Sequence, residues 1–186
     1  MCVTKGALAQ ARVEVPTFRA VAPGHAGDAA AIRVTVRGTS DHERALAGGQ
    51  DRRQLGLKLR AADGCNLVYV MWRLDPRPEL EVSIKRNPGA HTSAECGADG
   101  YTKIKPDGAL EPPPLADGAP HTLQAELAAA TLTAWIDGRV TWQGHLDATG
   151  LTGPAGLRSD NLSFSLDSLS VDARPGSVSA NCVDDP

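Results

Sequence analysis

The fold class follows from the stretch TLTAWIDGRVTW, residues 131–142. On both sides of Asp137-Gly138 the side chains alternate between apolar and other residues, which is the pattern of a half-buried strand. Asp-Gly between two such runs is the strongest short-range signal for a β-hairpin, because both residues accept the positive φ of a type I′ turn. This stretch therefore predicts two antiparallel strands joined by a tight turn.

The same alternation recurs along most of the chain. Gly, Pro, Asn and Asp clusters separate the alternating runs, and no run of 10–15 residues has helical periodicity. Many short strands at near-regular spacing predict an all-β fold, a two-sheet antiparallel jelly-roll sandwich. Besides the hairpin, strands are expected at residues 12–18, 31–37, 54–60, 67–74, 79–85, 122–127 and 161–171.

Length and composition bound the architecture and the partners. The chain has 186 residues, a net charge of −3 and 41% hydrophobic residues. This size predicts one domain over residues 1–186, and the apolar fraction excludes a disordered chain. The mildly acidic balance argues against nucleic acid as a partner. The longest apolar run, Leu67–Trp72, is far shorter than the ~20 residues of a membrane span.

The last third of the chain carries a recognisable pattern. Its parts are HTL at 121–123, AWIDG at 134–138, GPAGLRSDN at 153–161 and FSLDSLSV at 164–171. This pattern resembles the concanavalin A-like lectin/glucanase superfamily, in particular bacterial laminin-G-like jelly-roll domains. The resemblance covers residues 119–173, and strand order extends it over residues 10–86. Residues 87–118 do not match and are expected to be a loop insertion, whose proline run at 112–114 crosses between the sheets.

The resemblance implies two stacked antiparallel sheets, one of them curved. Members of the superfamily bind glycans or proteins on the concave sheet or on rim loops, and some bind calcium at the rim. Some branches are glycoside hydrolases or polysaccharide lyases. The matching motifs are structural, so they specify the fold and not the ligand.

Four cysteines, at positions 2, 65, 96 and 182, indicate the compartment. No pair has the C-x-x-C spacing of a zinc or redox site, and an even number favours disulfides in an oxidising compartment. Of the three possible pairings we favour Cys65–Cys96 together with Cys2–Cys182. Reduced thiols in a cytosolic protein, or lipidation of Cys2, are the alternatives.

An extracytoplasmic protein is thus predicted: secreted, periplasmic or on the cell surface. The first residues lack the apolar segment of a signal peptide, as in a mature chain or, alternatively, in a cytosolic protein. The excess of Arg over Lys and the abundance of Ala are typical of bacterial proteins.

Strands 67–74 and 79–85 supply a candidate ligand-binding face. If Val68 and the residues that alternate with it face the core, Tyr69 and Arg73 share the opposite face with Glu81 and Lys85. A tyrosine ring stacks on the C–H face of a sugar, and charged groups bind its hydroxyls. The alternative is a solvated sheet face with cross-strand salt bridges.

Aromatic residues are scarce, at 4% of the chain, which limits how a sugar could be bound. Tyr101 in the insertion and Trp135 on the hairpin are the other rings expected to be available for stacking. A face with so few rings would bind mainly through charge and hydrogen bonds. An acidic glycan, met by Arg73 and Lys85, is therefore the expected partner.

A catalytic alternative rests on a few residues. Glu79 and Glu81 lie on one strand face, roughly 6.5–7 Å apart, and resemble the acid-x-acid-x-acid strand of laminarinase-type glucanases. Ser83 replaces the third acid, which removes one expected catalytic carboxylate. His91 and Tyr101 of the insertion are the candidates for a lyase.

The sequence predicts a non-catalytic carbohydrate-binding or adhesion module acting on a glycan or cell-surface polysaccharide. A carbohydrate-active enzyme and a structural protein-interaction domain are the alternatives. No metal or cofactor site is expected from the scattered histidines. Bound calcium is the one alternative that the sequence leaves open, with Asp160, Asn161 and Asp147 as its candidate ligands.

Overall fold

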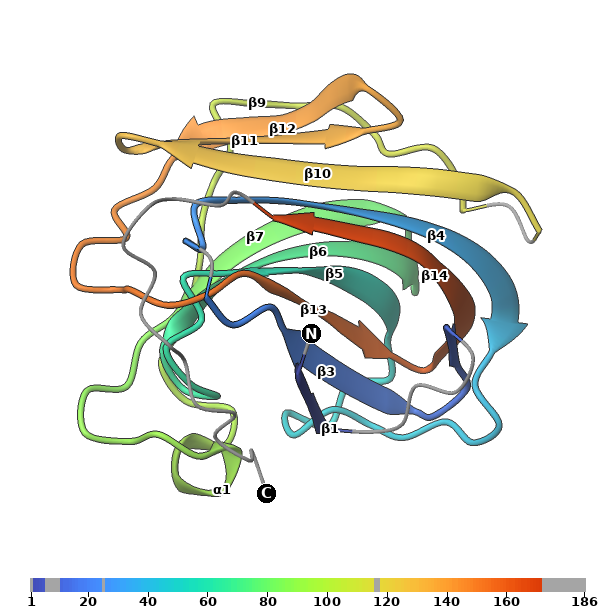
Figure 1. Cartoon of the computed structure of the whole chain (residues 1–186), viewed down its shortest axis with the longest axis horizontal. Helices are drawn as coiled ribbons and strands as arrows, with labels where there is room; N and C mark the ends of the chain where they lie inside the picture. Colours follow the sequence, from blue (N-terminus) through green and yellow to red (C-terminus); the bar gives the residue numbers. More distant parts are fainter. Residues whose placement is uncertain (1, 6–10, 25, 116–117, 172–186) are drawn as a thin grey trace.

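The structure is a computed structural model that describes residues 2–5, 11–24, 26–115 and 118–171, with the backbone alone for residues 2–5. Its described strands form two stacked antiparallel sheets of seven strands each, as Figure 1 shows. The first sheet has the order β1 (Cys2–Lys5), β3 (Thr17–Val21), β13 (Gly156–Asp160), β5 (Arg53–Leu59), β6 (Leu67–Asp75), β7 (Glu79–Lys85) and β8 (Tyr101–Lys103). The second sheet has the order β2 (Arg12–Val13), β14 (Leu162–Val171), β4 (Ala29–Thr39), β10 (Pro120–Ala128), β11 (Thr131–Ile136), β12 (Arg139–His145) and β9 (Gly108–Ala109). The predicted all-β jelly-roll sandwich is confirmed.

The hydrophobic core fills the space between the two sheets. Leu57 and Trp72 of the first sheet are at most 1% exposed, as are Ile32 and Leu123 of the second. These residues belong to one continuous apolar cluster. Burying a side chain of this size stabilises the fold by about 1.5–3 kcal/mol, so the alternation seen in the sequence is the source of the two-layer structure.

The hairpin at residues 131–142 has the geometry that its sequence predicts. Asp137 and Gly138 have φ values of 50° and 78°, both positive as a type I′ turn requires. The Asp137 carboxylate also accepts a hydrogen bond from the Thr122 backbone at 2.8 Å, which ties the turn to β10. Strands β11 and β12 pair in antiparallel register around this turn.

The predicted first strand, residues 12–18, is wrong as a single element. Arg12–Val13 pairs with β14 in the second sheet, whereas β3, which begins at Thr17, pairs with β13 in the first. Pro16 lies between the two strands and cannot donate to a ladder, so the chain changes sheets there. Apolar residues on both sides of the proline made two short strands look like one.

The insertion contains more structure than the loop expected from the sequence. It holds the short helix α1 (Ser93–Cys96) and two edge strands, with β8 pairing with β7 and β9 with β12. The crossing between sheets occurs at residues 104–107, where the Ile104 amide bonds to β7 and the Asp107 amide to β12. The proline run at 112–114 lies instead on the connection from β9 to β10, within the second sheet.

In the part of the chain that the structure describes, no helix is long and apolar enough to cross a membrane. The first sheet is curved, and its concave face points away from the second sheet (Figure 1). Two segments border this face: α1, in green, and the cyan connection between β4 and β5.

Candidate functional site

The concave face of the first sheet holds a groove with a volume of about 860 Å³. Its floor consists of alternate residues of neighbouring strands, since every second side chain of a strand points to the same face. Its walls are formed by residues 44–50 and by the segment 93–98 that includes α1. The described residues that make the floor are Thr17, Arg19, Gln54, Tyr69, Met71, Arg73, Glu79, Glu81, Ser83, Lys85, Tyr101, Lys103, Arg158 and Asp160.

The predicted division of β6 into two faces is observed. Val68, Val70 and Trp72 lie in the core, and the residues between them line the groove. Pairing with β7 places Arg73 opposite Glu79 and Met71 opposite Glu81. The structure thus brings Tyr69, Arg73, Glu81 and Lys85 onto one face, as the sequence predicts.

At one side of the groove Glu79 and Glu81 form an ion-pair cluster with surrounding cations. The Lys103 ammonium lies 2.7 Å from Glu79 and 3.0 Å from Glu81. Arg73 pairs with both carboxylates, and Arg52 approaches Glu81 to 3.5 Å. The cross-strand salt bridges considered as an alternative for this face are therefore present.

The environment of Glu81 keeps it ionised. Burial by itself would raise its pKa, but the hydrogen bond from Lys103 and the charges of Lys103, Arg52 and Arg73 outweigh that effect. The net result is a pKa below the ordinary value of 4.5. This carboxylate is a hydrogen-bond acceptor at neutral pH and holds no proton to give.

A second charged group, the Arg158–Asp160 pair, lies at the centre of the floor. The guanidinium donates two bonds to the carboxylate, at 2.9 and 3.1 Å, and Gln54 donates a third at 2.7 Å. Burial by itself would lower the pKa of Arg158, but the charge of Asp160, with contributions from Tyr69 and Tyr101, outweighs burial and raises this pKa well above its ordinary value. These three hydrogen bonds hold the pair in one position on the floor.

Sequence reasoning missed Arg158, Asp160 and Gln54 as floor residues. The sequence predicts a structural motif at residues 153–161 and a calcium-ligand role for Asp160, and neither prediction places these residues on the floor of a groove. The sequence does contain a signal for two of these residues, because Arg158 and Asp160 alternate with Leu157 and Ser159. The structure buries Leu157 and Ser159 completely. That alternation is typical of a strand with one core face and one face of charged residues.

The aromatic residues of the groove form a stacked pair. The Tyr69 and Tyr101 ring centroids lie 5.9 Å apart with 21° between their planes, and Arg158 lies 5.2 Å from the Tyr69 centroid. Tyr69 is only 3% exposed, whereas Tyr101 is 43% exposed. Tyr101 is therefore the ring that a ligand can reach, and Tyr69 supports it from below. Burial of the Tyr101 hydroxyl, with a smaller contribution from Tyr69, raises its pKa to about 12.

Lys85 lies under Tyr101, with its ammonium 5.1 Å from the ring centroid. The same ammonium donates to the backbone carbonyls of Gly97 at 2.9 Å and Gly64 at 3.3 Å. The residue is 3% exposed. Its contacts connect the floor of the groove to the α1 wall.

Two predicted site residues lie away from the groove. Trp135 is on β11 of the second sheet, where it alternates with the buried residues Ala134 and Ile136 and faces outward. It cannot share a site with Tyr69, because the whole core lies between the two sheets. His91 is exposed and binds Asp63 at 2.8 Å, and it is not among the described residues that line the groove. A joint role of His91 and Tyr101 in a lyase site therefore has no support in this arrangement.

The candidate calcium ligands are engaged in other bonds. The Asp160 carboxylate binds Arg158 and Gln54, and the Asn161 amide donates to the carbonyls of Arg44 and Arg52. The Asp147 carboxylate accepts from the Thr149 backbone. Across the described residues, no group of three or more His, Cys, Asp and Glu side chains gathers as a metal site would need.

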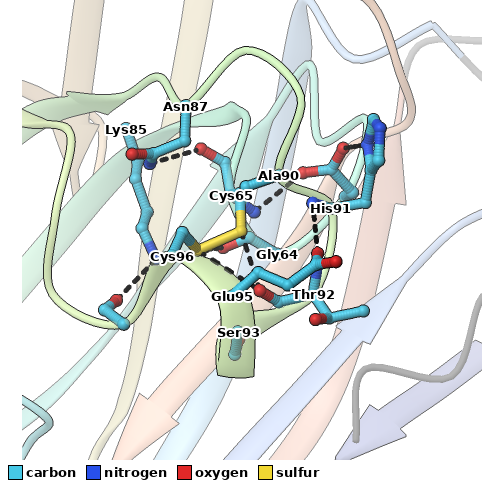
Figure 2. Close-up of a disulfide and its surroundings, with 12 residues drawn as sticks. Gly64, Cys65, Lys85, Asn87, Ala90, His91, Thr92, Ser93, Glu95 and Cys96 are labelled. Carbon is cyan, nitrogen blue, oxygen red and sulfur yellow. Dashed lines mark hydrogen bonds and ion pairs between the residues drawn. A yellow bond between two sulfur atoms is a disulfide. The ribbon is translucent and has the colours of Figure 1, made fainter.

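The predicted Cys65–Cys96 disulfide is present, as Figure 2 shows. It joins the loop between β5 and β6 to the last residue of α1. The predicted Cys2–Cys182 pair lies outside the residues whose side chains the structure describes.

Comparison with known proteins gives no match to a family model and no match among curated protein sequences. Solved structures do match. The carbohydrate-binding module CBM66 from Bacillus subtilis is similar with a TM-score of 0.62 and 11% identity, over 90% of this chain and 91% of that chain. A tetrameric galectin from the ball sponge Cinachyrella sp. is similar with a TM-score of 0.50 and 16% identity, over 84% of this chain and 99% of that chain. Galectin-Ib from Xenopus laevis is similar with a TM-score of 0.51 and 12% identity, over 82% of this chain and 98% of that chain.

At such low identity these similarities define an architecture and leave the ligand open. Membership of the laminin-G-like branch stays a prediction. What the comparisons and the two-sheet topology establish is the fold: the chain is a two-sheet antiparallel jelly-roll β-sandwich, similar in architecture to CBM66 and the galectins.

Proposed function

We propose that this protein is a non-catalytic carbohydrate-binding module that acts outside the cytoplasm and binds an acidic glycan in the groove of its first sheet. The observation that carries the proposal is the charge of the groove. Among the residues that the structure describes, eight cationic residues line it against three acidic ones, although the whole chain has a net charge of −3. The cationic residues are Arg19, Arg44, Arg52, Arg73, Arg77, Lys85, Lys103 and Arg158, and the acidic ones are Glu79, Glu81 and Asp160.

The groove has the mixture of groups that a sugar requires. Tyr101 offers an exposed ring for the C–H face of a pyranose. The carboxylates of Glu79 and Glu81 can accept bonds from hydroxyls, and arginines can hold a uronate or sulfate group in bidentate fashion. The similar solved structures support this assignment, since their names describe a carbohydrate-binding module and galectins.

The chemistry of the carboxylates favours binding over hydrolysis. A glycosidase needs one carboxylic acid whose pKa is raised so that it can protonate the leaving group. Glu81 has a lowered pKa, and both carboxylates are held in ion pairs. Tyr101, with a pKa of about 12, stays protonated and is a poor base for a lyase.

The extracytoplasmic setting rests on the Cys65–Cys96 disulfide. Structural disulfides persist in oxidising compartments and are rare where thiols are kept reduced. A soluble or surface-bound polysaccharide is the partner that such a location would supply.

Retention on a polysaccharide panel tests the proposal. Polygalacturonate, alginate, hyaluronan and heparin represent acidic glycans, and dextran and mannan represent neutral ones. We expect retention on at least one acidic polymer, weakened by salt because exposed charges are screened, with no new reducing ends and no unsaturated uronate absorbance. Products from any polymer would favour the enzyme, and retention on none would favour a protein-interaction domain.

Two variants locate the site. Tyr101→Ala should weaken binding about three- to tenfold, the range expected for one aromatic contact. Trp135→Ala removes a partly exposed ring from the outer face of the second sheet and should leave binding unchanged. If the two variants behave alike, the groove is not the binding site.

A further inference from the structure

The α1 wall of the groove is held in place with almost no apolar packing. Helix α1 has only four residues, and Cys96 is its one buried residue. Ser93, Ala94, Gly97 and Ala98 of this segment line the groove. An element with so little buried apolar surface has little intrinsic tendency to stay in one position.

Polar contacts and one covalent bond connect this wall to the sandwich, and Figure 2 shows the disulfide with Lys85 beside it. Lys85 donates to the Gly97 carbonyl at 2.9 Å, and Asn66 donates to the Ala90 carbonyl at 2.9 Å. Arg19 donates to the Ser93 hydroxyl at 2.8 Å, which joins the wall to β3 of the floor. The Cys65–Cys96 disulfide is the covalent member of this set.

We infer that the Cys65–Cys96 disulfide is a clamp that holds the α1 wall in its ligand-binding position, so that glycan affinity depends on the oxidation state of this pair. The inference rests on the proposed function and adds a form of regulation to it. When a dithiol reduces the pair, its thiolate displaces one sulfur and its second thiol completes the exchange. The protein gains two thiols, and the reductant becomes a cyclic disulfide.

Opening this clamp should leave the sandwich folded. Neither cysteine belongs to the two apolar clusters that form the core. Both sulfur-bearing residues are nevertheless buried, Cys65 completely and Cys96 to 97%. A reductant therefore reaches the bond when the wall moves, and a glycan that contacts the wall should slow the reduction, because binding and wall position are linked reciprocally.

The test compares two double variants. Cys65→Ser/Cys96→Ser removes the clamp, and Cys2→Ser/Cys182→Ser is the matched control that keeps it. Affinity is measured by calorimetry with an oligosaccharide of whichever polysaccharide retains the wild type. We expect the first variant to bind at least tenfold more weakly and the control to bind like the wild type. Equal affinities of the two variants would overturn the inference.

Hydrogen–deuterium exchange supplies a readout that needs no ligand. Amides of residues 92–99 should exchange faster in Cys65→Ser/Cys96→Ser, while the core strands keep their protection. Unchanged exchange at 92–99 would overturn the inference even if no glycan is found. Absence of binding by the oxidised wild type would instead count against the proposed function.

If the clamp variant does not fold, the control variant provides the same comparison. It contains only Cys65 and Cys96, so dithiothreitol reduces this pair alone. Affinity and exchange are then measured before and after reduction. We expect the same loss of affinity and the same local loss of protection, and no change in either would contradict the clamp.

Discussion

Removing the charge of Asp160 should destabilise the protein strongly. Asp160 is 1% exposed, and its carboxylate accepts two bonds from Arg158 and one from Gln54. Asp160→Asn keeps the size of the side chain but leaves the buried guanidinium without its counter-charge. Breaking a buried ion pair from one side costs about 3–5 kcal/mol. For a chain of this length, this corresponds to a fall in Tm of about 6–20 °C.

Urea unfolding followed by tryptophan fluorescence measures the change. Asp167→Asn is the matched control, because this carboxylate is exposed on β14 and accepts one hydrogen bond, from Thr35. It should cost less than about 1 kcal/mol. A double variant, Arg158→Met/Asp160→Leu, should recover most of the stability, since apolar replacement of a buried pair is often neutral. If Asp160→Asn costs no more than Asp167→Asn, the pair does not organise the floor as described.

Three other changes test separate parts of the first sheet and its α1 wall. Gly56→Ala should cost more than about 2 kcal/mol in urea unfolding, because a Cβ there would meet the Val70 carbonyl and the Met71 backbone; a neutral effect would mean that the sheet adjusts freely. Glu81 has a lower pKa folded than unfolded, so the stability it contributes is present above pH 4.5 and is lost as pH falls through its folded pKa. Glu81→Gln should therefore lose less stability than the wild type when the pH is lowered from 6 to 3, and equal losses would contradict the pKa assignment. Cys65→Ser/Cys96→Ser should lower the free energy of unfolding by about 3–4 kcal/mol, because the disulfide closes a loop across 31 residues of the unfolded chain. Guanidinium unfolding measures this loss. A loss below about 1 kcal/mol would show that opening the loop adds little conformational freedom to the unfolded chain.

The layers of the fold could be predicted from the sequence because strand alternation is a local property. Leu55, Leu57 and Leu59 alternate with Gln54 and Lys58, and the structure buries the three leucines in the core. The Asp137-Gly138 turn is equally local, since it depends on the two residues that must take positive φ. Such features need no knowledge of distant contacts.

The edges of the sheets could not be predicted in this way. Strands β8 and β9 have three and two residues, and each exists because a neighbouring strand offers an unpaired edge. The division of residues 12–18 between two sheets also depends on partners far along the chain. Short strands of this kind are defined by tertiary pairing more than by their own sequence.

The sequence predicts which strands form the candidate site and which residues face it, but not how these side chains pack against one another. Alternation placed Tyr69 and Arg73 on the correct face, but it could not show that Tyr101 covers Tyr69 and leaves it 3% exposed. Nor could it show that Arg158, some 90 residues along the chain, lies beside the same ring. Accessibility depends on which distant strands become neighbours, and that information is absent from local periodicity.

An acidic glycan should bind in the groove of the first sheet and nowhere else on the sandwich. The most direct test is chemical-shift mapping of the isotope-labelled protein with a short oligosaccharide of the acidic polymer that retains it best. Amide shifts should concentrate on β3, β5, β6, β7, β8, β13 and residues 93–98, with few changes on β10 to β12. Shifts concentrated on the outer face of β10 to β12, with the groove strands unchanged, would contradict it.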